Sequence, residues 1–339
     1  MSENDRIIAI AGGSGFIGRA IVRRLVAIPG LTVRVLTRDP QKARARIAVE
    51  GKLDFVAADV NDPAPLATAI VGADTIINAA QFDGYPIEKS SRGLTFNRVD
   101  YGGTVALIAA AKEAGVANFI YISGAAADER SSNPAFRAKG RAERALRDAG
   151  LAFTIFRPSL VYGPEDRVVN GLAKAVRLTP VMVVPGSGQQ KLRPLLVNDL
   201  AACVALAIDG RGRNGIYEVG GPEAMTFDEL VRLVMERTGH KRPIVHVPES
   251  MLRIAGMVAE KLPGSLFSRD AVAFLVADND CDIQPLVTSS GSRWRPPARA
   301  SRTYRAPDGI LFSSCRDAEY ATASPQARAC ANRSLHGQS

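Results

Sequence analysis

Residues that bind metals or form disulfide bonds are scarce in this sequence. Its 339 residues include four cysteines and three histidines, and no two cysteines form a Cys-x-x-Cys pair. Structural zinc sites and disulfide frameworks need such clusters. We therefore predict that the chain binds no metal and that its cysteines are reduced thiols.

Long apolar runs are also absent. No stretch reaches the ~18–20 apolar residues that a membrane-spanning helix needs, and the short polar segment before Ile7 leaves no room for a signal peptide. These absences predict a cytoplasmic protein without a transmembrane segment. The 46% share of apolar residues is enough for a large core, in one domain or in two coupled ones.

Positive charge is unevenly distributed along the chain. The formal net charge is +9, but the segment from Ser289 onward holds eight arginines against three acidic residues and so carries five of these charges. The remainder of the chain is only mildly basic. The charge therefore does not predict a nucleic-acid partner.

A glycine-rich turn near the N-terminus joins a predicted strand to a predicted helix. The apolar run 7–11 ends at Gly12, and Gly15 and Gly18 follow at intervals of three before apolar residues recur at helical spacing. A strand, a glycine turn and a helix in this order bring backbone amides close to a pyrophosphate at the helix N-terminus. This motif predicts a dinucleotide site, whose cofactor-binding residues also include Ser14, Phe16 and Ile17.

Strands and helices alternate through the first half of the chain. Between predicted strands at 32–37, 53–57, 75–78, 118–123 and 153–156 lie helical stretches, among them 63–70, 99–114 and 138–149. This alternation predicts an α/β fold, with a Rossmann-type doubly wound parallel sheet in residues 1–160. Ligands bind at the carboxyl ends of such strands. The cofactor-binding residues predicted there are Asp59, Val60, Ala79 and Ala80.

The end of the second predicted strand favours NADP(H) over NAD(H). NAD sites place a carboxylate at this point for the ribose 2′-hydroxyl, but here Thr37 is followed by Arg38. A guanidinium suits a 2′-phosphate, although an ordinary solvated arginine is the alternative. Asp39 precedes Pro40, which predicts a helix N-cap rather than a ribose ligand.

Beyond Arg157 the pattern changes. Short predicted strands at 181–184, 195–197 and 216–219 mix with helices, which predicts a smaller C-terminal α/β substrate lobe in residues 161–288, interleaved with the core. In 249–262 an apolar stripe at helical spacing favours packing against the core or a partner over binding along a membrane surface. Residues 289–339 are rich in Ser, Arg, Ala and Pro, which predicts a disordered tail or an aberrant one produced by a shifted reading frame.

Together these residues resemble the extended or atypical short-chain dehydrogenase/reductases, over about residues 5–288. Gly163-Pro164-Glu165-Asp166-Arg167 with Asn170 is similar to the epimerase/dehydratase-like branch related to the NDUFA9-type accessory subunit of respiratory complex I. The motifs that carry the similarity are Gly12-x-x-Gly15-x-x-Gly18, Asp59-Val60, Asn78-Ala79-Ala80, Arg157-Pro158-Ser159, Tyr162-Gly163-Pro164, Val197-x-Asp199-Leu200-Ala201 and Gly220-Gly221-Pro222.

The resemblance implies a Ser-Tyr-Lys site, in which a tyrosine exchanges a proton while the nicotinamide moves a hydride. Lys139 fits the lysine of Tyr-x-x-x-Lys, but Ala135 stands at the tyrosine position with Phe136 beside it. Gly124 stands at the serine position, one residue after Ser123. Two of the three catalytic groups are therefore missing.

The residues left for this site follow from the same resemblance. Lys139 is expected to bind the nicotinamide ribose, and Ser123 and Pro158 are also expected at the cofactor. A replacement proton donor could be Tyr162, or a tyrosine of the 81–101 loop such as Tyr85. For each tyrosine, packing or surface exposure without a catalytic role is the simpler interpretation.

Three functions agree with these observations. The first is NADP(H)-dependent reduction or epimerisation of a small or nucleotide-linked substrate, with a non-standard acid. The second is a non-catalytic protein, stabilised by its cofactor, that engages respiratory complex I or its assembly machinery and could lie at the inner membrane as a peripheral protein. The third is a sensor of the NADP(H) ratio.

Overall fold

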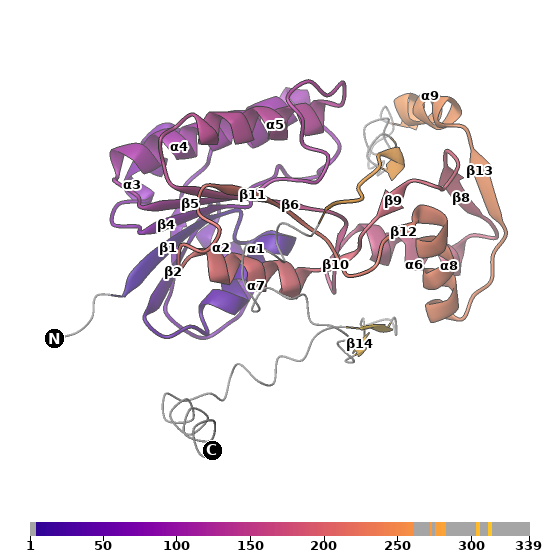
Figure 1. Ribbon diagram of the computed structural model, residues 1–339, viewed down its shortest axis with the longest axis horizontal. Coiled ribbons are helices and arrows are strands. Elements are labelled where there is room, and N and C mark those ends of the chain that lie inside the picture. The colour runs from indigo at the N-terminus through magenta and orange to yellow at the C-terminus, as the bar shows by residue number, and fades with distance from the viewer. Residues whose placement is uncertain (1–4, 260–271, 273–274, 283–302, 306–310, 314–339) are drawn as a thin grey trace, which may run out of the picture. The chain divides into compact units, whose positions relative to one another are not determined.

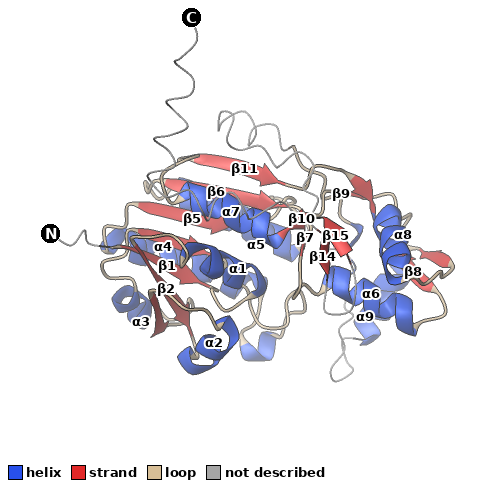
Figure 2. Cartoon of the chain, turned by 90° about the horizontal axis from the view of Figure 1, so that it is seen from below, coloured by secondary structure: helices blue, strands red, loops and turns tan. Residues whose placement is uncertain are grey.

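The first half of the chain builds a parallel sheet, as its alternating pattern predicts. In the computed structural model, which describes residues 5–259, 272, 275–282, 303–305 and 311–313, seven strands lie in the order β11-β6-β5-β4-β1-β2-β3. All neighbouring pairs are parallel, and Figure 2 shows the sheet. The strands are β1 (Arg6–Ala11), β2 (Leu31–Thr37), β3 (Leu53–Ala57), β4 (Thr75–Asn78), β5 (Asn118–Ile122), β6 (Phe153–Pro158) and β11 (Gly215–Val219).

Helices cover both faces of this sheet (Figure 1). One face holds α3 (Pro63–Ala69), α4 (Gly103–Glu113) and α5 (Pro134–Arg147), and the other holds α1 (Phe16–Leu25), α2 (Pro40–Ile47) and α7 (Val197–Ala207). Each face has its own apolar core, one shared by α1 and α7 and the other by α3, α4 and α5. The α/β Rossmann-type fold predicted from the sequence is therefore confirmed.

The second half contributes two elements to the sheet lobe itself. We expected 216–219 to be a short strand of the substrate lobe, but β11 pairs with β6 at the edge of the main sheet, with Ile216 opposite Ile155. The helix α7 packs in the same core as α1. A short apolar run carries no information about which distant strand it will join, so the sequence could not place this edge.

The remaining elements form a smaller lobe beside the sheet. They are β7 (Val161–Tyr162), α6 (Val168–Leu178), β8 (Met182–Pro185), β9 (Lys191–Leu192), β10 (Leu195–Leu196), β12 (Met225–Thr226), α8 (Phe227–Thr238), β13 (Ile244–Val247) and α9 (Glu249–Ala259). Three two-stranded sheets, β7 with β10, β8 with β13 and β9 with β12, organise these elements. Two other helical turns, η1 (Ser90–Arg92) and the π-helix η2 (Phe96–Gly102), precede α4.

Local capping explains where several helices start. Asp39 accepts a hydrogen bond from the Lys42 amide, 2.9 Å long, and Pro40 follows it. Asp39 is thus the N-cap that the sequence predicts. A capping box at Thr226 and Glu229 starts α8.

The tail is only partly described. Strands β14 (Thr303–Arg305) and β15 (Leu311–Ser313) pair as an antiparallel hairpin, and residues 297–339 form a unit separate from residues 1–296. The rest of the predicted disordered tail lies outside the described residues. Among the described residues, no helix is long and apolar enough to cross a membrane, and no group of His, Cys, Asp or Glu side chains is arranged to hold a metal ion.

Candidate functional site

The glycine-rich turn lies where the strand order of the sheet reverses. From β1 the chain adds β2 and β3 on one side and β4 on the other, and this reversal point is where open parallel sheets bind their ligands. Gly12 follows β1 with a φ of +78°, and a Cβ there would lie 2.5 Å from the Ala79 carbonyl oxygen after β4. A Cβ on Gly18 would lie 2.1 Å from the Gly12 oxygen. Both positions therefore require glycine.

The helix that follows the turn presents uncapped amides. Gly15 is the N-cap of α1 and has no side chain to accept hydrogen bonds from the first turn, while its own amide donates to the Gly12 oxygen over 2.9 Å. Uncapped N–H groups at the positive end of a helix suit a phosphate. The turn thus fits the pyrophosphate of a dinucleotide. Ser14 lies in the turn and Phe16 and Ile17 begin α1, and their contacts with a cofactor stay predictions.

Arg38 follows the strand next to this turn. Register places Ala11 of β1 opposite Leu36 of β2, so Thr37 and Arg38 continue alongside the glycine turn. The Thr37 hydroxyl is engaged with the Asp39 backbone at 3.3 Å, whereas the Arg38 side chain is exposed. The guanidinium is therefore accessible to an anionic group at this edge.

Two further predicted segments also end strands at this edge. One Asp59 oxygen accepts from both the Asn61 amide and the Asn61 side chain at 2.9 Å, which fixes the turn after β3. Val60 packs against α4, because a Cβ on Gly103 would lie 2.7 Å from it. Ala79 and Ala80 are half-buried after β4.

Ser123 directly follows β5, and its buried side chain is engaged within the protein. Its hydroxyl donates to Glu143 Oε1 over 2.5 Å, and Glu143 is also held by Arg157 through bonds of 2.9 and 2.5 Å. The predicted cofactor role of Ser123 thus competes with a buried hydrogen bond. Glu143 carries no signal as a single residue, but it stands four residues after Lys139, on the same face of α5.

Lys139 forms a buried ion pair that was not predicted from the sequence. The side chain is 4% exposed, and its ammonium lies 3.5 Å from Oδ1 of Asp100 and 5.8 Å from the centre of the Tyr121 ring. Asp100 belongs to the π-helix η2, and such segments are frequent at functional sites. Burial raises the pKa of Asp100 to about 6, although the Lys139 charge opposes this rise.

Gly124, at the expected serine position, lies beside this lysine. A Cβ on Gly124 would lie 3.6 Å from Lys139 Cδ, so Gly124 leaves space next to the lysine side chain. The position after β5 and the lysine of α5 therefore meet, as the family pattern implies. The Thr104 hydroxyl donates to the backbone carbonyl oxygen of Asp100 over 2.5 Å. Any residue at position 100 could accept this bond, so no local signal in the sequence marked Asp100.

The tyrosine position is filled by packing. Ala135 and Phe136 are buried in a cluster with Phe82, Phe96 and other apolar residues. Tyr85 lies in ring contact with Phe96, and burial raises its pKa well above the usual range, so that it is a poor proton donor. Tyr162 is buried in β7, and Pro158 is buried at the end of β6.

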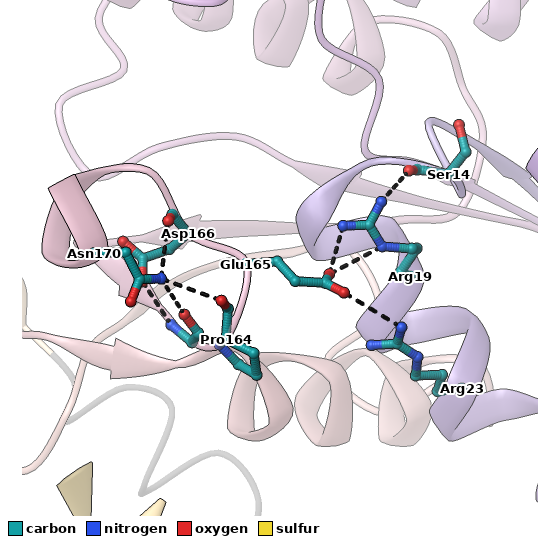
Figure 3. A network of polar contacts seen from close by, with 8 residues as sticks. Ser14, Arg19, Arg23, Pro164, Glu165, Asp166 and Asn170 are labelled. Carbon is teal, nitrogen blue, oxygen red and sulfur yellow. Dashed lines mark hydrogen bonds and ion pairs between the residues drawn. The ribbon is translucent and has the colours of Figure 1, made fainter. Parts of the chain in front are cut away.

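The loop at 163–170 is bound to the first helix by an ion-pair network (Figure 3). Glu165 accepts from Arg19 Nε at 3.0 Å and lies 3.5 Å from Arg23. Arg19 also donates to the Ser14 carbonyl oxygen over 2.9 Å. Asp166 and Asn170 hold the loop itself, because Asp166 accepts from the Val169 amide over 2.6 Å and Asn170 donates to the Gly163 carbonyl over 3.0 Å. The segment that resembles the NDUFA9-type branch therefore supports the glycine turn through Glu165 and Arg19.

Comparison with known proteins agrees with this geometry. An NAD(P)H-binding family model matches residues 12–175. A subunit of mitochondrial NADH dehydrogenase (ubiquinone), 1 alpha subcomplex subunit 9 of Arabidopsis thaliana, is 27% identical over 292 residues, 82% of this chain and 71% of the relative. The ceramide reductase of Caulobacter vibrioides is 31% identical over 257 residues, 75% of this chain and 77% of the relative.

Solved structures show the same fold. A double mutant of the dTDP-glucose 4,6-dehydratase DesIV of Streptomyces venezuelae, with NAD bound, superposes with a TM-score of 0.60 at 23% identity, covering 71% of this chain and 84% of that one. The fold and the glycine turn define an NAD(P)-binding Rossmann protein. The chain belongs to the extended or atypical short-chain dehydrogenase/reductases and is related to the NDUFA9-type subunits.

Proposed function

We propose that the chain binds NADP(H) at the glycine turn. The close backbone packing that Gly12 and Gly18 permit in the turn, together with the uncapped start of α1, carries this proposal. Gly15, Ser14, Phe16 and Ile17 would face the pyrophosphate, and the predicted adenine and ribose contacts would come from Asp59, Val60, Ala79 and Ala80. Ser123, Lys139 and Pro158 remain the residues proposed nearest the nicotinamide half.

Arg38 would select NADP(H) by pairing with the 2′-phosphate. The position lacks a carboxylate acceptor for a ribose hydroxyl, and the Arg38 guanidinium is exposed beside the turn. A charge-assisted hydrogen bond of this kind contributes about 1.5–3 kcal/mol, which corresponds to about 10- to 100-fold in affinity.

Titration of the purified protein with both cofactors tests this assignment. We expect Arg38→Ala to raise the Kd for NADPH about 10- to 100-fold and to leave the Kd for NADH unchanged. Arg46→Ala, which removes another exposed arginine of the adjacent helix α2, should change neither. Equal NADPH affinity in wild type and Arg38→Ala would contradict the 2′-phosphate assignment.

We further propose that the protein is a reductase with Lys139 in place of the missing tyrosine. Bound NADPH supplies a hydride for a carbonyl carbon. The Lys139 ammonium, held by Asp100 and reached past Gly124, would donate its proton to the carbonyl oxygen as the alcohol forms. Support comes from the buried pair at 3.5 Å and from the similarity to a protein named ceramide reductase.

Turnover measurements decide whether Lys139 has this role. Lys139→Met should lower kcat for carbonyl-dependent NADPH oxidation about 100-fold, the usual scale for a lost general acid. The exposed Lys112 of α4 gives a matched control, since Lys112→Met should retain wild-type kcat. An unchanged kcat in Lys139→Met would overturn the assignment.

A non-catalytic accessory role is the second candidate. The observation that favours it is the burial of Ala135 and Phe136 where the proton-transferring tyrosine would stand, and the similarity to a mitochondrial NADH dehydrogenase subunit supports it. In this case NADPH should raise the melting temperature by mass action without turnover on any carbonyl or quinone. Purification should then recover respiratory complex components with the protein.

A further inference from the structure

One face of the small β8–β13 sheet is apolar and exposed. The two strands are parallel, and Val183 of β8 stands opposite Val245 of β13. These two valines are 48% and 45% exposed, whereas Met182 and Val184, on the opposite face of the sheet, are buried. The exposed face of a half-buried sheet is normally polar. This face is therefore unusual.

The apolar surface continues at both ends of the sheet. Leu178, at the end of α6, is 71% exposed, and Val181 is exposed at the start of β8. On α9, which follows β13 directly, Met251 is 61% exposed and Ile254 is also exposed. Of the large apolar side chains that the described residues expose, six of eight lie between positions 178 and 254. The apolar stripe predicted in 249–262 is thus not packed into the core over its described part.

Positive charge accompanies this surface. The segments 174–183 and 239–247 contain Lys174, Arg177, Lys241 and Arg242, two histidines and no carboxylate. Two bonds of 2.9 Å link the segments, from Arg242 Nε to the Val176 oxygen and from the Met182 amide to the Pro243 oxygen. These bonds hold the two segments together at the end of the β8–β13 sheet where Met182 lies opposite Ile244.

Arg177 and Arg242 each have a partner within the protein, whereas the described part of the chain offers no carboxylate partner to Lys174 or Lys241. Asp228 is buried and engaged with His246 at 2.9 Å and with Arg232 at 3.1 Å. Glu249 lies 3.4 Å from Arg253 of the same helix. The lysines at 174 and 241 are exposed. An anionic partner is thus favoured at this end of the sheet.

We propose that this surface binds an anionic lipid bilayer. The surface consists of the exposed face of Val183 and Val245, of Leu178 and Val181, and of the cations beside them. Exposed apolar side chains bordered by lysine and arginine are what peripheral proteins place in the headgroup region. A second copy of the chain would bring like charges together at the same apolar face, which is unfavourable. The inference depends on this surface alone and does not require the proposed reductase activity.

Binding of the full chain to vesicles tests the proposal. We expect cosedimentation with vesicles of phosphatidylcholine and phosphatidylglycerol, little with phosphatidylcholine alone, and weaker binding as salt rises. Val183→Asp with Lys241→Glu should weaken binding by at least ~10-fold, because one apolar anchor is lost and one cation is replaced by an anion. Val71→Asp with Lys112→Glu makes the same changes at exposed positions of the sheet lobe and should bind as wild type.

Three results would overturn the proposal. The first is equal binding to the two kinds of vesicle, and the second is wild-type binding by the Val183→Asp, Lys241→Glu variant. The third is that the wild-type protein is a dimer that binds neither kind of vesicle, while the variant is a monomer. Far-ultraviolet circular dichroism and melting of each variant establish that it remains folded, and Val245→Ser offers a milder change of the same face.

Discussion

Gly18 is a position where the glycine turn does not tolerate a side chain. Its Cβ would meet the Gly12 carbonyl oxygen at 2.1 Å, and that oxygen is backbone, which cannot rotate away. The turn and the first helix would have to separate. The backbone amides proposed to bind the pyrophosphate would then be displaced as a group.

We expect Gly18→Ala to lower the free energy of unfolding by about 3 kcal/mol, the upper range for forced overpacking, and to abolish NADPH binding. Gly171→Ala provides the control, because a Cβ at this glycine of α6 meets nothing within 4 Å. There the change should stabilise the helix by about 0.5–1 kcal/mol. Denaturant unfolding and calorimetric titration measure both effects, and retained NADPH affinity in Gly18→Ala would be inconsistent with this geometry.

Substitutions of Asp100 and Lys139 should have coupled effects on the free energy of unfolding. Removing one partner leaves the other charge buried without compensation, which typically costs about 3–5 kcal/mol. The Asp100→Asn, Lys139→Met double variant removes both charges, so its loss of stability should be smaller than the sum of the two single losses. Additive losses in denaturant unfolding would mean that the two residues do not interact.

Asp100 should also make stability depend on pH. Burial raises its pKa from the ordinary value of 3.8 to about 6 in the folded chain. The folded state therefore holds this proton more tightly than the unfolded state, and Asp100 destabilises the fold progressively as pH rises from about 4 to about 6. Relative to Asp100→Asn, the wild type should gain stability when pH falls from 7 to 5. The groups around Asp100 that could modify this dependence are Lys139, Glu88, Tyr85 and Tyr121.

Among the elements, the loop at 163–170 connects the small lobe to the glycine turn. Arg19 is nearly buried and is held by Glu165 on one side and by the Ser14 carbonyl on the other. Glu165→Gln should therefore destabilise the protein by about 1–3 kcal/mol and weaken NADPH binding. Glu129→Gln, which removes an exposed pair with Arg144, should change stability by less than about 1 kcal/mol. Equal melting temperatures for the two variants would argue against a supporting role for Glu165.

Sequence patterns located the local elements better than the contacts between them. The glycine turn, the Asp39 cap and the capping box of α8 are local signals, and the structure has each of them. The strand at 216–219 was predicted in the wrong place. It pairs with β6, which lies about sixty residues earlier in the chain, and the periodicity of a sequence carries no information about pairing over such a separation.

The candidate site divides in the same way. Its glycines follow from spacing along the chain, whereas Asp100 and Glu143 acquire their roles only when η2, α5, β5 and β6 come together. The predicted helix at 99–114 overlaps the π-helix Phe96–Gly102, which was not predicted. This π-helix carries Asp100, which pairs with Lys139. Helical periodicity alone does not distinguish the two helix types.

For the whole molecule, the division of the chain predicts the effect of truncation. Residues 1–296 form one compact unit, and residues 297–339 form another. A chain ended at Pro296 should therefore unfold at the same temperature as the full chain and bind NADPH with the same affinity. A marked loss of either in calorimetry would mean that the tail supports the first unit.

The hold of Arg19 on Ser14 has a consequence for regulation. Whatever displaces the 163–170 loop must disturb Glu165, then Arg19, and through it a carbonyl of the nucleotide-binding turn. A compound bound to the small lobe would then change the affinity of the turn for its nucleotide. The nucleotide would change the affinity of the small lobe for that compound by the same factor.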